Sequence, residues 1–447
     1  MTLIDLTTEV TDPSDTPDSL HSPQRISTVF FVLGSGVLLS GLIVNPWVGS
    51  SYRGDITNYY DVMLYYFSSS VICAVLLFVC SFLLHTSASK WIERIAMIVL
   101  AVSAIVLSDR LLLARLGLPL WIADKENHFK HRPGSIRNFQ DKLIRINKYG
   151  HHDSDFPMEK AENEFRGVML GDSITMGHGV THEESFSNQL EDILREKYGD
   201  RRTFQIINTG VQGYATFQEY NVLVDSLKFE PDFVAVQFCL NDLTEPFVVE
   251  RRFGGTGVHY HGVAEEPTGM MSFLLNETGF GRLVQEFLNR GKTVENAQRW
   301  EIYDTKKAAE STRNDPTFSK SWDVTLSYLD KIYDLTTERN IRVLLVIAPH
   351  TYQMIDDRFT QPQKILVEHA RARGIDVLDL TPVFAELIFD ENTLATLRDR
   401  GFSDDEIDAL YEKRIRKFFL DQDHYTPEGH QVVAKELLNH IKQKYVF

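Results

Sequence analysis

The chain is poor in cysteine, with only three among its 447 residues. Cys73 and Cys80 lie inside one apolar stretch and Cys239 stands alone, so the sequence offers neither a disulfide framework nor the spacing of a structural zinc site. Basic residues are also scarce, since 46 lysines and arginines face 62 acidic residues and leave a formal net charge of -16. A nucleic-acid partner, which would need a basic face, is therefore not expected.

The N-terminus lacks the basic residues with which a secretory signal peptide begins. Its first basic residue is Arg25, and the acidic residues that precede it are Asp5, Glu9, Asp12, Asp15 and Asp18. This order disfavours a cleavable signal peptide. We expect residues 1–26 to form a disordered acidic tail.

Long apolar stretches, by contrast, are concentrated in the first quarter of the chain. They run over Ser27–Val44, Val62–Leu84 and Trp91–Leu107. A helix that crosses a bilayer needs about 20 mostly apolar residues, so we expect a three-helix transmembrane anchor over residues 27–110 rather than three buried core helices. The basic residues that flank these stretches are too evenly divided for the positive-inside rule to choose an orientation.

Residues 111–165 are predicted to form a charged connector. It contains four histidines, which we expect to be solvated because no cysteine or carboxylate lies at metal-ligand spacing: His128, His131, His151 and His152. Further along, His259 and His261 form a His-x-His pair without a third ligand. We interpret that pair as part of a solvent-facing loop, and we expect no metal and no cofactor.

From residue 166 to the C-terminus, short β-branched runs alternate with amphipathic stretches. The runs have the length and composition of strands and cover residues 167–170, 204–207, 233–238, 343–348 and 377–380. Such alternation predicts an α/β fold, a three-layer α/β/α sandwich around a mostly parallel five-stranded sheet of flavodoxin-like type. Two insertions interrupt the pattern, at about 244–323 and 389–419.

Polar residues follow these runs where the strands end, which is where ligands bind in parallel sheets. Ser173 follows Asp172 after the first run, "NTGVQG" ends the second, Asn241 follows the third, and Asp421 and His424 lie near the C-terminus. Taken alone, Ser173 is as well suited to capping a helix as to attacking a substrate. Together the residues form the set that a serine hydrolase needs.

The sequence from about residue 166 onward resembles the SGNH hydrolases, the GDSL-type esterases and lipases. "GDSIT" is similar to the nucleophile block of that family, "NTGVQG" to the second block, "CLND" to the third and "DQDH" to the last. The resemblance implies that Ser173 is the nucleophile, His424 the base and Asp421 the residue that orients it. One position departs from the family pattern, because Cys239 stands where a glycine is usual.

By the same resemblance, the backbone N–H groups of Ser173 and Gly213 and the side chain of Asn241 form the oxyanion hole. Gly210 is the alternative to Gly213. The expected activity is that of a membrane-anchored esterase that cleaves an acylated glycan, lipid or small molecule through an acyl-enzyme.

Two other functions remain open from the sequence. One is an O-acyltransferase that uses the same triad to move the acyl group to a glycan hydroxyl, and the other is a non-catalytic membrane module with an SGNH-like fold. Because anchored members of the family often act on cell-envelope material, we expect an integral membrane protein with its catalytic domain outside the cytoplasm. The sequence does not indicate an oligomeric state.

Overall fold

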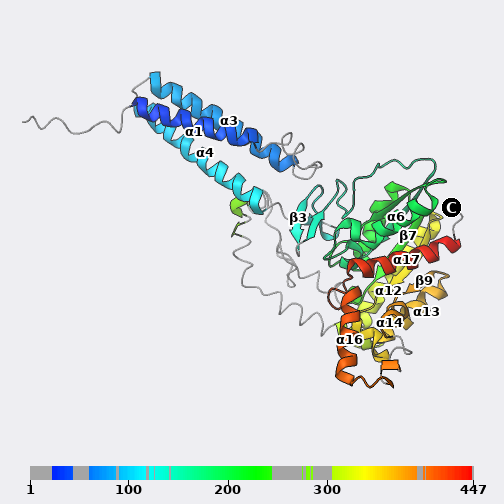
Figure 1. Cartoon of the computed structure of the whole chain (residues 1–447). Coiled ribbons are helices and arrows are strands. Elements are labelled where there is room, and N and C mark those ends of the chain that lie inside the picture. Colours follow the sequence, from blue (N-terminus) through cyan, green and yellow to red (C-terminus); the bar gives the residue numbers. More distant parts are fainter. Residues whose placement is uncertain are drawn as a thin grey trace, which may run out of the picture. The chain divides into compact units, whose positions relative to one another are not determined.

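The computed structural model describes residues 23–43, 60–86, 90–116, 120–124, 126–139, 142–243, 274, 278–281, 283–284, 305–389, 396–397 and 399–444. These residues fall into two compact units (Figure 1). The first contains the three N-terminal helices and residues 278–280, and the second begins at Gly117. Residues 1–22 of the predicted tail lie outside the described residues. Residues 23–26 belong to the first helix, which begins at Pro23.

The first unit is built from α1 (Pro23–Ile43), α3 (Tyr60–Thr86) and α4 (Lys90–Leu116). Helices α1 and α3 approach closely because small residues face each other, and a Cβ on Gly41 would lie only 2.7 Å from Ser70 Cβ. The hydroxyls of Ser27 and Ser81 each donate to the backbone carbonyl of the other residue at 2.8 Å. Close packing of small residues with shared hydroxyl contacts is typical of helices that associate in lipid.

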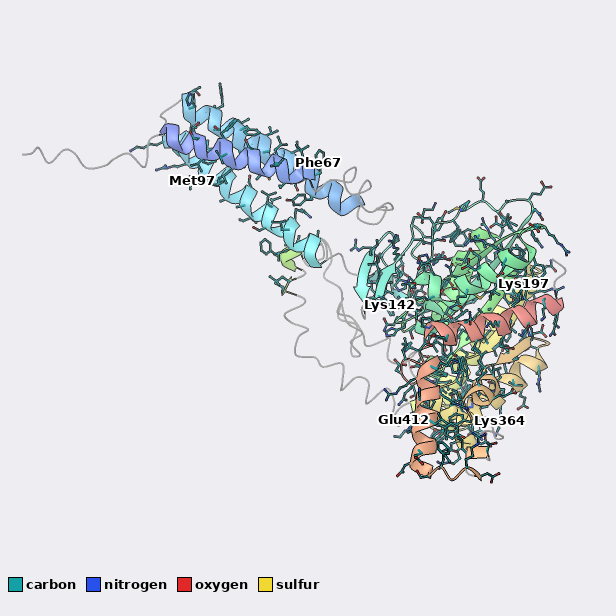
Figure 2. The ribbon with its side chains drawn as sticks, in the orientation of Figure 1. Phe67, Met97, Lys142, Lys197, Lys364 and Glu412 are labelled. Carbon is teal, nitrogen blue, oxygen red and sulfur yellow. The ribbon has the colours of Figure 1, made fainter. Side chains whose placement is uncertain are left out.

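Two helices in the described part of the chain are long and apolar enough, by length and composition, to cross a membrane: Tyr66–Thr86 and Lys90–Leu113. The apolar part of α1, Ser27–Leu42, is shorter, so the structure supports two such helices where the sequence suggested three. Large apolar side chains point outward from the unit, and Met97 is 58% exposed (Figure 2). Helix α4 also continues to Leu116, past the boundary predicted at residue 110.

The second unit contains the predicted five-stranded sheet. Its strands are β5 (Glu164–Leu170), β6 (Thr203–Asn208), β7 (Phe233–Phe238), β8 (Arg342–Ile347) and β9 (Asp376–Asp379). All neighbours pair in parallel in the order β6-β5-β7-β8-β9, which is the flavodoxin-like order. Every residue of β5 and β7 is buried, because parallel strands are covered on both faces.

Helices cover both faces of this sheet and complete the predicted sandwich. On one face the core is closed by α6 (Phe186–Tyr198), α14 (Thr381–Phe389), α16 (Asp404–Phe418) and α17 (Pro427–Lys444). On the other it is closed by α7 (Thr216–Ser226), α12 (Ser319–Glu338) and α13 (Gln361–Ala372). Short 3-10 helices lie at His182–Glu184, Leu227–Phe229, Thr351–Met354 and Asp357–Thr360.

From Gly117 onward, the predicted connector belongs to the second unit. It forms two antiparallel hairpins, β1 (Trp121–Asp124) with β2 (His128–His131) and β3 (Ile136–Phe139) with β4 (Lys142–Arg145). The expectation that its histidines are solvated was wrong for His131 and His152, which are both completely buried. Burial lowers the pKa of His131 to about 3 and that of His152 to about 4.

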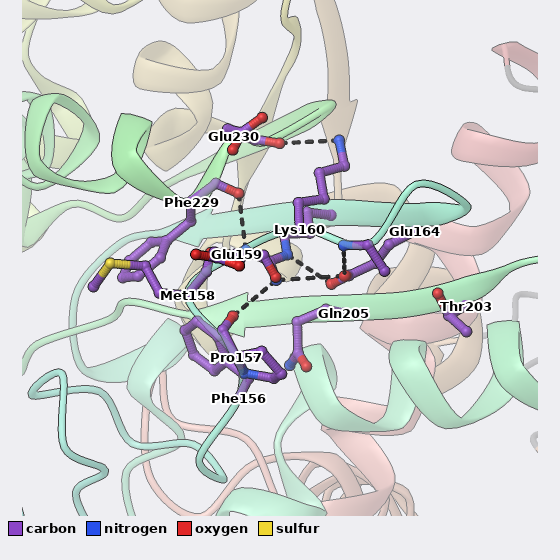
Figure 3. A network of polar contacts seen from close by, with 12 residues as sticks. Phe156, Pro157, Met158, Glu159, Lys160, Glu164, Thr203, Gln205, Phe229 and Glu230 are labelled. Carbon is purple, nitrogen blue, oxygen red and sulfur yellow. Dashed lines mark hydrogen bonds and ion pairs between the residues drawn. The ribbon is translucent and has the colours of Figure 1, made fainter.

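A buried arginine ties the end of the connector to the sheet. The guanidinium of Arg166, in β5, donates to the carbonyls of Pro157, Met158 and Glu159 at 2.7 to 2.9 Å and to the carboxylate of Glu164 at 2.6 Å (Figure 3). A buried guanidinium is stable only when its donors are satisfied in this way. This end of the connector is therefore held against β5 by charge-assisted hydrogen bonds.

The two predicted insertions are described only in part. Most of residues 244–323, including His259 and His261, lies outside the described residues. Within the first unit, the backbone N–H of Phe280 donates to the carboxylate of Asp109 in α4 at 2.9 Å. In the second insertion, α16 begins at a capping box in which Ser403 and Glu406 bond to each other's backbone N–H. Its amphipathic sequence forms the 15-residue helix Asp404–Phe418.

Candidate active site

A tight turn after β5 presents Ser173. Gly171 has no room for a side chain, because a Cβ there would lie 2.2 Å from Thr175 Oγ1 and 2.5 Å from Gln237 Oε1. Asp172, rather than Ser173, caps the short helix α5 (Ser173–Met176), since its Oδ1 accepts the N–H of Ile174 at 2.9 Å. Ser173 therefore does not cap this helix through its side chain, and its hydroxyl makes other contacts.

The hydroxyl of Ser173 contacts the C-terminal loop. Its Oγ lies 2.8 Å from Nε2 of His424, and Nδ1 of the same ring lies 2.8 Å from Oδ2 of Asp421. The other oxygen of Asp421 accepts the backbone N–H groups of Asp423 at 3.1 Å and His424 at 2.9 Å. The structure thus brings together three predicted residues that are up to 251 positions apart in the chain.

Two carboxylates surround the imidazole of His424. Besides Asp421, an oxygen of Asp423 lies 3.4 Å from Nδ1. Burial by itself would lower the pKa of His424, but the charge of Asp423, followed by the hydrogen bond and charge of Asp421, outweighs burial and raises it to about 10. Burial would likewise raise the pKa of Asp421, and its contacts with His424 reverse this and hold that pKa well below its usual value.

Two histidines near His424 were missed by the sequence analysis. His178 stacks on the ring of His424 with centroids 4.1 Å apart and 29° between the planes. His350 lies with Nε2 3.9 Å from Oδ2 of Asp423. Burial, with repulsion from His424, lowers the pKa of each to about 3, so both rings are neutral at pH 7. His178 lies five residues after Ser173, and that short separation was the only signal in the sequence.

The residues predicted for the oxyanion hole lie at the same edge of the sheet. The amide nitrogen of Asn241 donates to Oδ2 of Asp172 at 2.6 Å, so the amide is aligned beside the turn that carries Ser173. Gly213 has a φ of 76°, which favours glycine. Gly210 instead donates its N–H to Asn208 Oδ1 at 3.1 Å, and a Cβ there would meet Met176 N at 2.2 Å. Gly210 is thus required for close packing, and its N–H is already engaged.

Buried acids lie behind this edge. Asp242 accepts the hydroxyl of Thr216 and the backbone N–H of Cys239, both at 2.9 Å. Burial raises the pKa values of Asp172, Asp242 and Glu219, and the repulsion of Glu219 by the two aspartates adds to its shift. The side chain of Cys239, at the position that departs from the family pattern, is fully buried with Sγ 3.6 Å from Nδ1 of His350.

Several solved structures match this chain at low identity and low TM-score. A lipase/acylhydrolase from Enterococcus faecalis is 14% identical, with a TM-score of 0.32 over 63% of this chain and 96% of that one. A mutant of an acetyl-xylooligosaccharide esterase from Geobacillus Stearmophilus is 13% identical, with a TM-score of 0.35 over 62% and 94%. A two-domain esterase active on acetylated mannans is 14% identical, with a TM-score of 0.33 over 63% of this chain and 49% of that one.

A comparison with curated proteins gave no match. The profile of the GDSL-like Lipase/Acylhydrolase family, however, matches residues 169–432, which include Ser173 and His424. That match covers more than half of the 447 residues. The chain therefore belongs to the GDSL-like lipase/acylhydrolase family.

Proposed function

We propose that the protein is a membrane-anchored serine esterase in which Ser173, His424 and Asp421 form the catalytic triad. One observation carries this proposal, namely the continuous chain of two 2.8 Å contacts from the serine hydroxyl through the imidazole to the carboxylate. A hydroxyl, a base and an orienting acid in this order constitute the activated nucleophile of acyl transfer. The proposed substrate is a carboxylic ester of a glycan or lipid.

In the proposed mechanism, the neutral form of His424 accepts the proton of Ser173 through Nε2 while Oγ attacks the ester carbonyl. Because the pKa of His424 is raised to about 10, the share of this neutral form, and with it the activity, grows as the pH rises toward that value. Asp421 fixes the ring so that Nδ1 carries its proton and stabilises the imidazolium that forms. The imidazolium then gives its proton to the leaving alcohol, and water resolves the acyl-enzyme by the same route. His178 contributes a neutral stacked face, which limits the orientations that the ring of His424 can adopt.

The negative oxygen of the tetrahedral intermediate is proposed to be met by the backbone N–H groups of Ser173 and Gly213 and by Asn241. The bond to Asp172 supports this role, because a side-chain amide has two N–H donors and fixing one direction orients the other. Donors that are aligned before the reaction need no reorganisation when the charge develops.

The first unit is proposed to anchor the enzyme in a membrane, with the catalytic domain outside the cytoplasm. The support is physical: apolar side chains such as Phe31, Ile98 and Phe82 are 58 to 67% exposed, and a contiguous apolar surface of this kind is unfavourable in water. A lipid bilayer removes that cost. Protease digestion of intact and lysed cells would test the side on which residues 117–447 lie.

The activity is tested with a panel of acetyl, butyryl and long-chain esters, each with and without a sugar acceptor, on the purified full-length protein. We expect release of the free acid with at least one ester. Transfer of the acyl group to the sugar in place of hydrolysis would identify an acyltransferase. The absence of both reactions, together with the absence of labelling by a fluorophosphonate, would indicate a non-catalytic module.

Replacing the amide of Asn241 tests the oxyanion hole. We expect Asn241→Ala to lower kcat by about 100- to 1000-fold with little change in KM, because the lost hydrogen bond forms only as charge develops on the substrate. Steady-state kinetics on a soluble ester measure both constants, and the thermal unfolding midpoint controls for the lost contact with Asp172. A change confined to KM would instead make Asn241 a ground-state binding residue.

Removing the first unit tests the anchor. A chain that begins at Gly117 keeps both hairpins, and we expect it to fold and to cleave a small soluble ester within a few-fold of the full-length rate, because tethering adds local concentration but no contact. A chain that begins at Glu164 is the control. This shorter chain lacks His152, whose Nδ1 lies 2.6 Å from Met176 O, and Asp153, whose carboxylate accepts the N–H of Asn208 at 3.0 Å. We expect it to unfold. A folded but inactive Gly117 chain would place the helices in the active site.

A further inference from the structure

Three metal-binding side chains converge beside the proposed triad. They are the thiol of Cys239, the imidazole of His350 and the carboxylate of Asp423, and one ligand atom of each lies within 4.8 Å of the others. The sulfur is 3.6 Å from Nδ1 of His350, and Asp423 Oδ2 is 3.9 Å from Nε2. Neither the cysteine nor His350 has a role in the proposed mechanism.

The backbone holds two of these ligands firmly and the third within reach. Cys239 directly follows β7, and its N–H is bound by Asp242. His350 follows β8, and its N–H donates to Gln353 Oε1 at 2.9 Å. Asp423 comes from the C-terminal loop, which is joined to the His350 segment by a 2.7 Å bond from Thr351 N to Gln422 O. Asp423 is also the ligand that solvent reaches, with 17% of its side chain exposed.

We propose that Cys239, His350 and Asp423 bind a divalent metal ion of the zinc class. One sulfur, one nitrogen and one oxygen ligand with an open fourth position suit tetrahedral Zn²⁺. Bonds of about 2.0 to 2.3 Å place ligand atoms about 3.3 to 3.8 Å apart in such a site, which the sulfur and Nδ1 already satisfy. Asp423 completes the site by rotating its carboxylate from Nε2 toward Nδ1, and the thiol proton is released to solvent as the metal binds.

Metal binding at this place has a consequence that rests on the proposed function. Zinc would draw Asp423 away from His424, which it approaches to 3.4 Å, and would bring positive charge next to a ring that must become an imidazolium. Both effects disfavour the transition state of acyl transfer. The site would therefore inhibit the esterase reversibly, and a chelator would restore activity.

Cobalt binding tests the site without any activity measurement. Full-length protein in detergent is stripped with a chelator and titrated with Co²⁺, whose bond to a thiolate gives a charge-transfer absorption band in the near ultraviolet. We expect one Co²⁺ per chain with this band, and we expect Zn²⁺ to displace it. The absence of the band in the wild-type protein would overturn the proposal.

Matched variants locate the site. Cys239→Ala should abolish the band, whereas Cys80→Ala, which removes a buried thiol from the other unit, should leave it unchanged. His350→Gln should weaken Co²⁺ binding by at least about 100-fold. This variant tests the site if Cys239→Ala fails to fold. Ser173→Ala should bind Co²⁺ as the wild type does, so failure of the triad and failure of the metal site are distinguishable. A band that survives in both Cys239→Ala and His350→Gln would refute the assignment.

Inhibition is measured separately. Zn²⁺ should inhibit ester cleavage by the wild-type protein, and Cys239→Ala should resist it at the same concentration. Equal inhibition of the two proteins would mean that zinc acts elsewhere, for instance on Asp421 and His424 directly, and would overturn the regulatory part of the proposal.

Discussion

Ser173→Ala is expected to lower kcat for ester hydrolysis by about 10⁶-fold, the size of loss that follows removal of the nucleophile from a serine hydrolase. Alanine cannot supply the attacking oxygen, and the hydroxyl lies 2.8 Å from the base that activates it. The fold should be unaffected, because Asp172 rather than Ser173 caps α5. Covalent labelling by a fluorophosphonate should disappear together with the activity.

A variant of the base His424 tests whether the loss in Ser173→Ala comes from the triad. His424→Ala should lose about as much activity as Ser173→Ala, and the double variant should lose no more, because the two residues act as one unit. Ser154→Ala, at an exposed serine, is the control and should retain full activity. Wild-type turnover in Ser173→Ala, or losses that multiply in the double variant, would contradict the proposed triad.

The fold of the second unit was predictable because its strands are buried on both faces. Runs such as "FVAVQF" in β7 are apolar except for Gln237, and such a run indicates burial on both faces. The hairpins of the connector escaped prediction because their strands, such as "HFKH" in β2 and "KLIR" in β4, carry charged residues in place of an apolar run. Their stability comes instead from side chains that bind distant elements, as His152 does at Met176.

The residues of the candidate site divide in the same way. Ser173, Asn241, Asp421 and His424 follow strands or share a short loop, so their positions along the chain indicated that they meet at one edge of the sheet. Cys239 and His350 are 111 residues apart, and neither has a motif that links it to the other. Only the pairing of β7 with β8 brings them together. Contacts that depend on strand order across a sheet are not encoded in local spacing.

The first unit shows a third limit of prediction from the sequence. The anchor was predicted to end at residue 110, yet α4 continues to Leu116. Asp109 is 7% exposed and its carboxylate accepts the N–H of Phe280, so this charge near the predicted boundary is a contact point for a segment far along the chain.

The orienting acid gives the second large effect. Asp421→Asn should lower kcat by about 10³-fold, less than the roughly 10⁴-fold cost in a triad with a single carboxylate. An asparagine in place of Asp421 can donate to Nδ1, which puts the ring proton on Nε2 and prevents it from accepting the serine proton. Asp423, 3.4 Å from Nδ1, opposes that tautomer because it still favours a proton on Nδ1.

A double-mutant cycle separates the two carboxylates. Asp423→Asn alone should cost well under about 10-fold, and the double variant should approach a loss of about 10⁴-fold. That loss exceeds the product of the two single losses, which is a coupling that independent residues would not show. The acid limb of the kcat/KM profile should also move to lower pH in each variant. Both carboxylates raise the pKa of His424, so removing either lowers it and the neutral base appears at lower pH. All measurements are made with a chelator present. A 10⁴-fold loss in Asp421→Asn that Asp423→Asn does not deepen would show that Asp423 has no share in orienting His424.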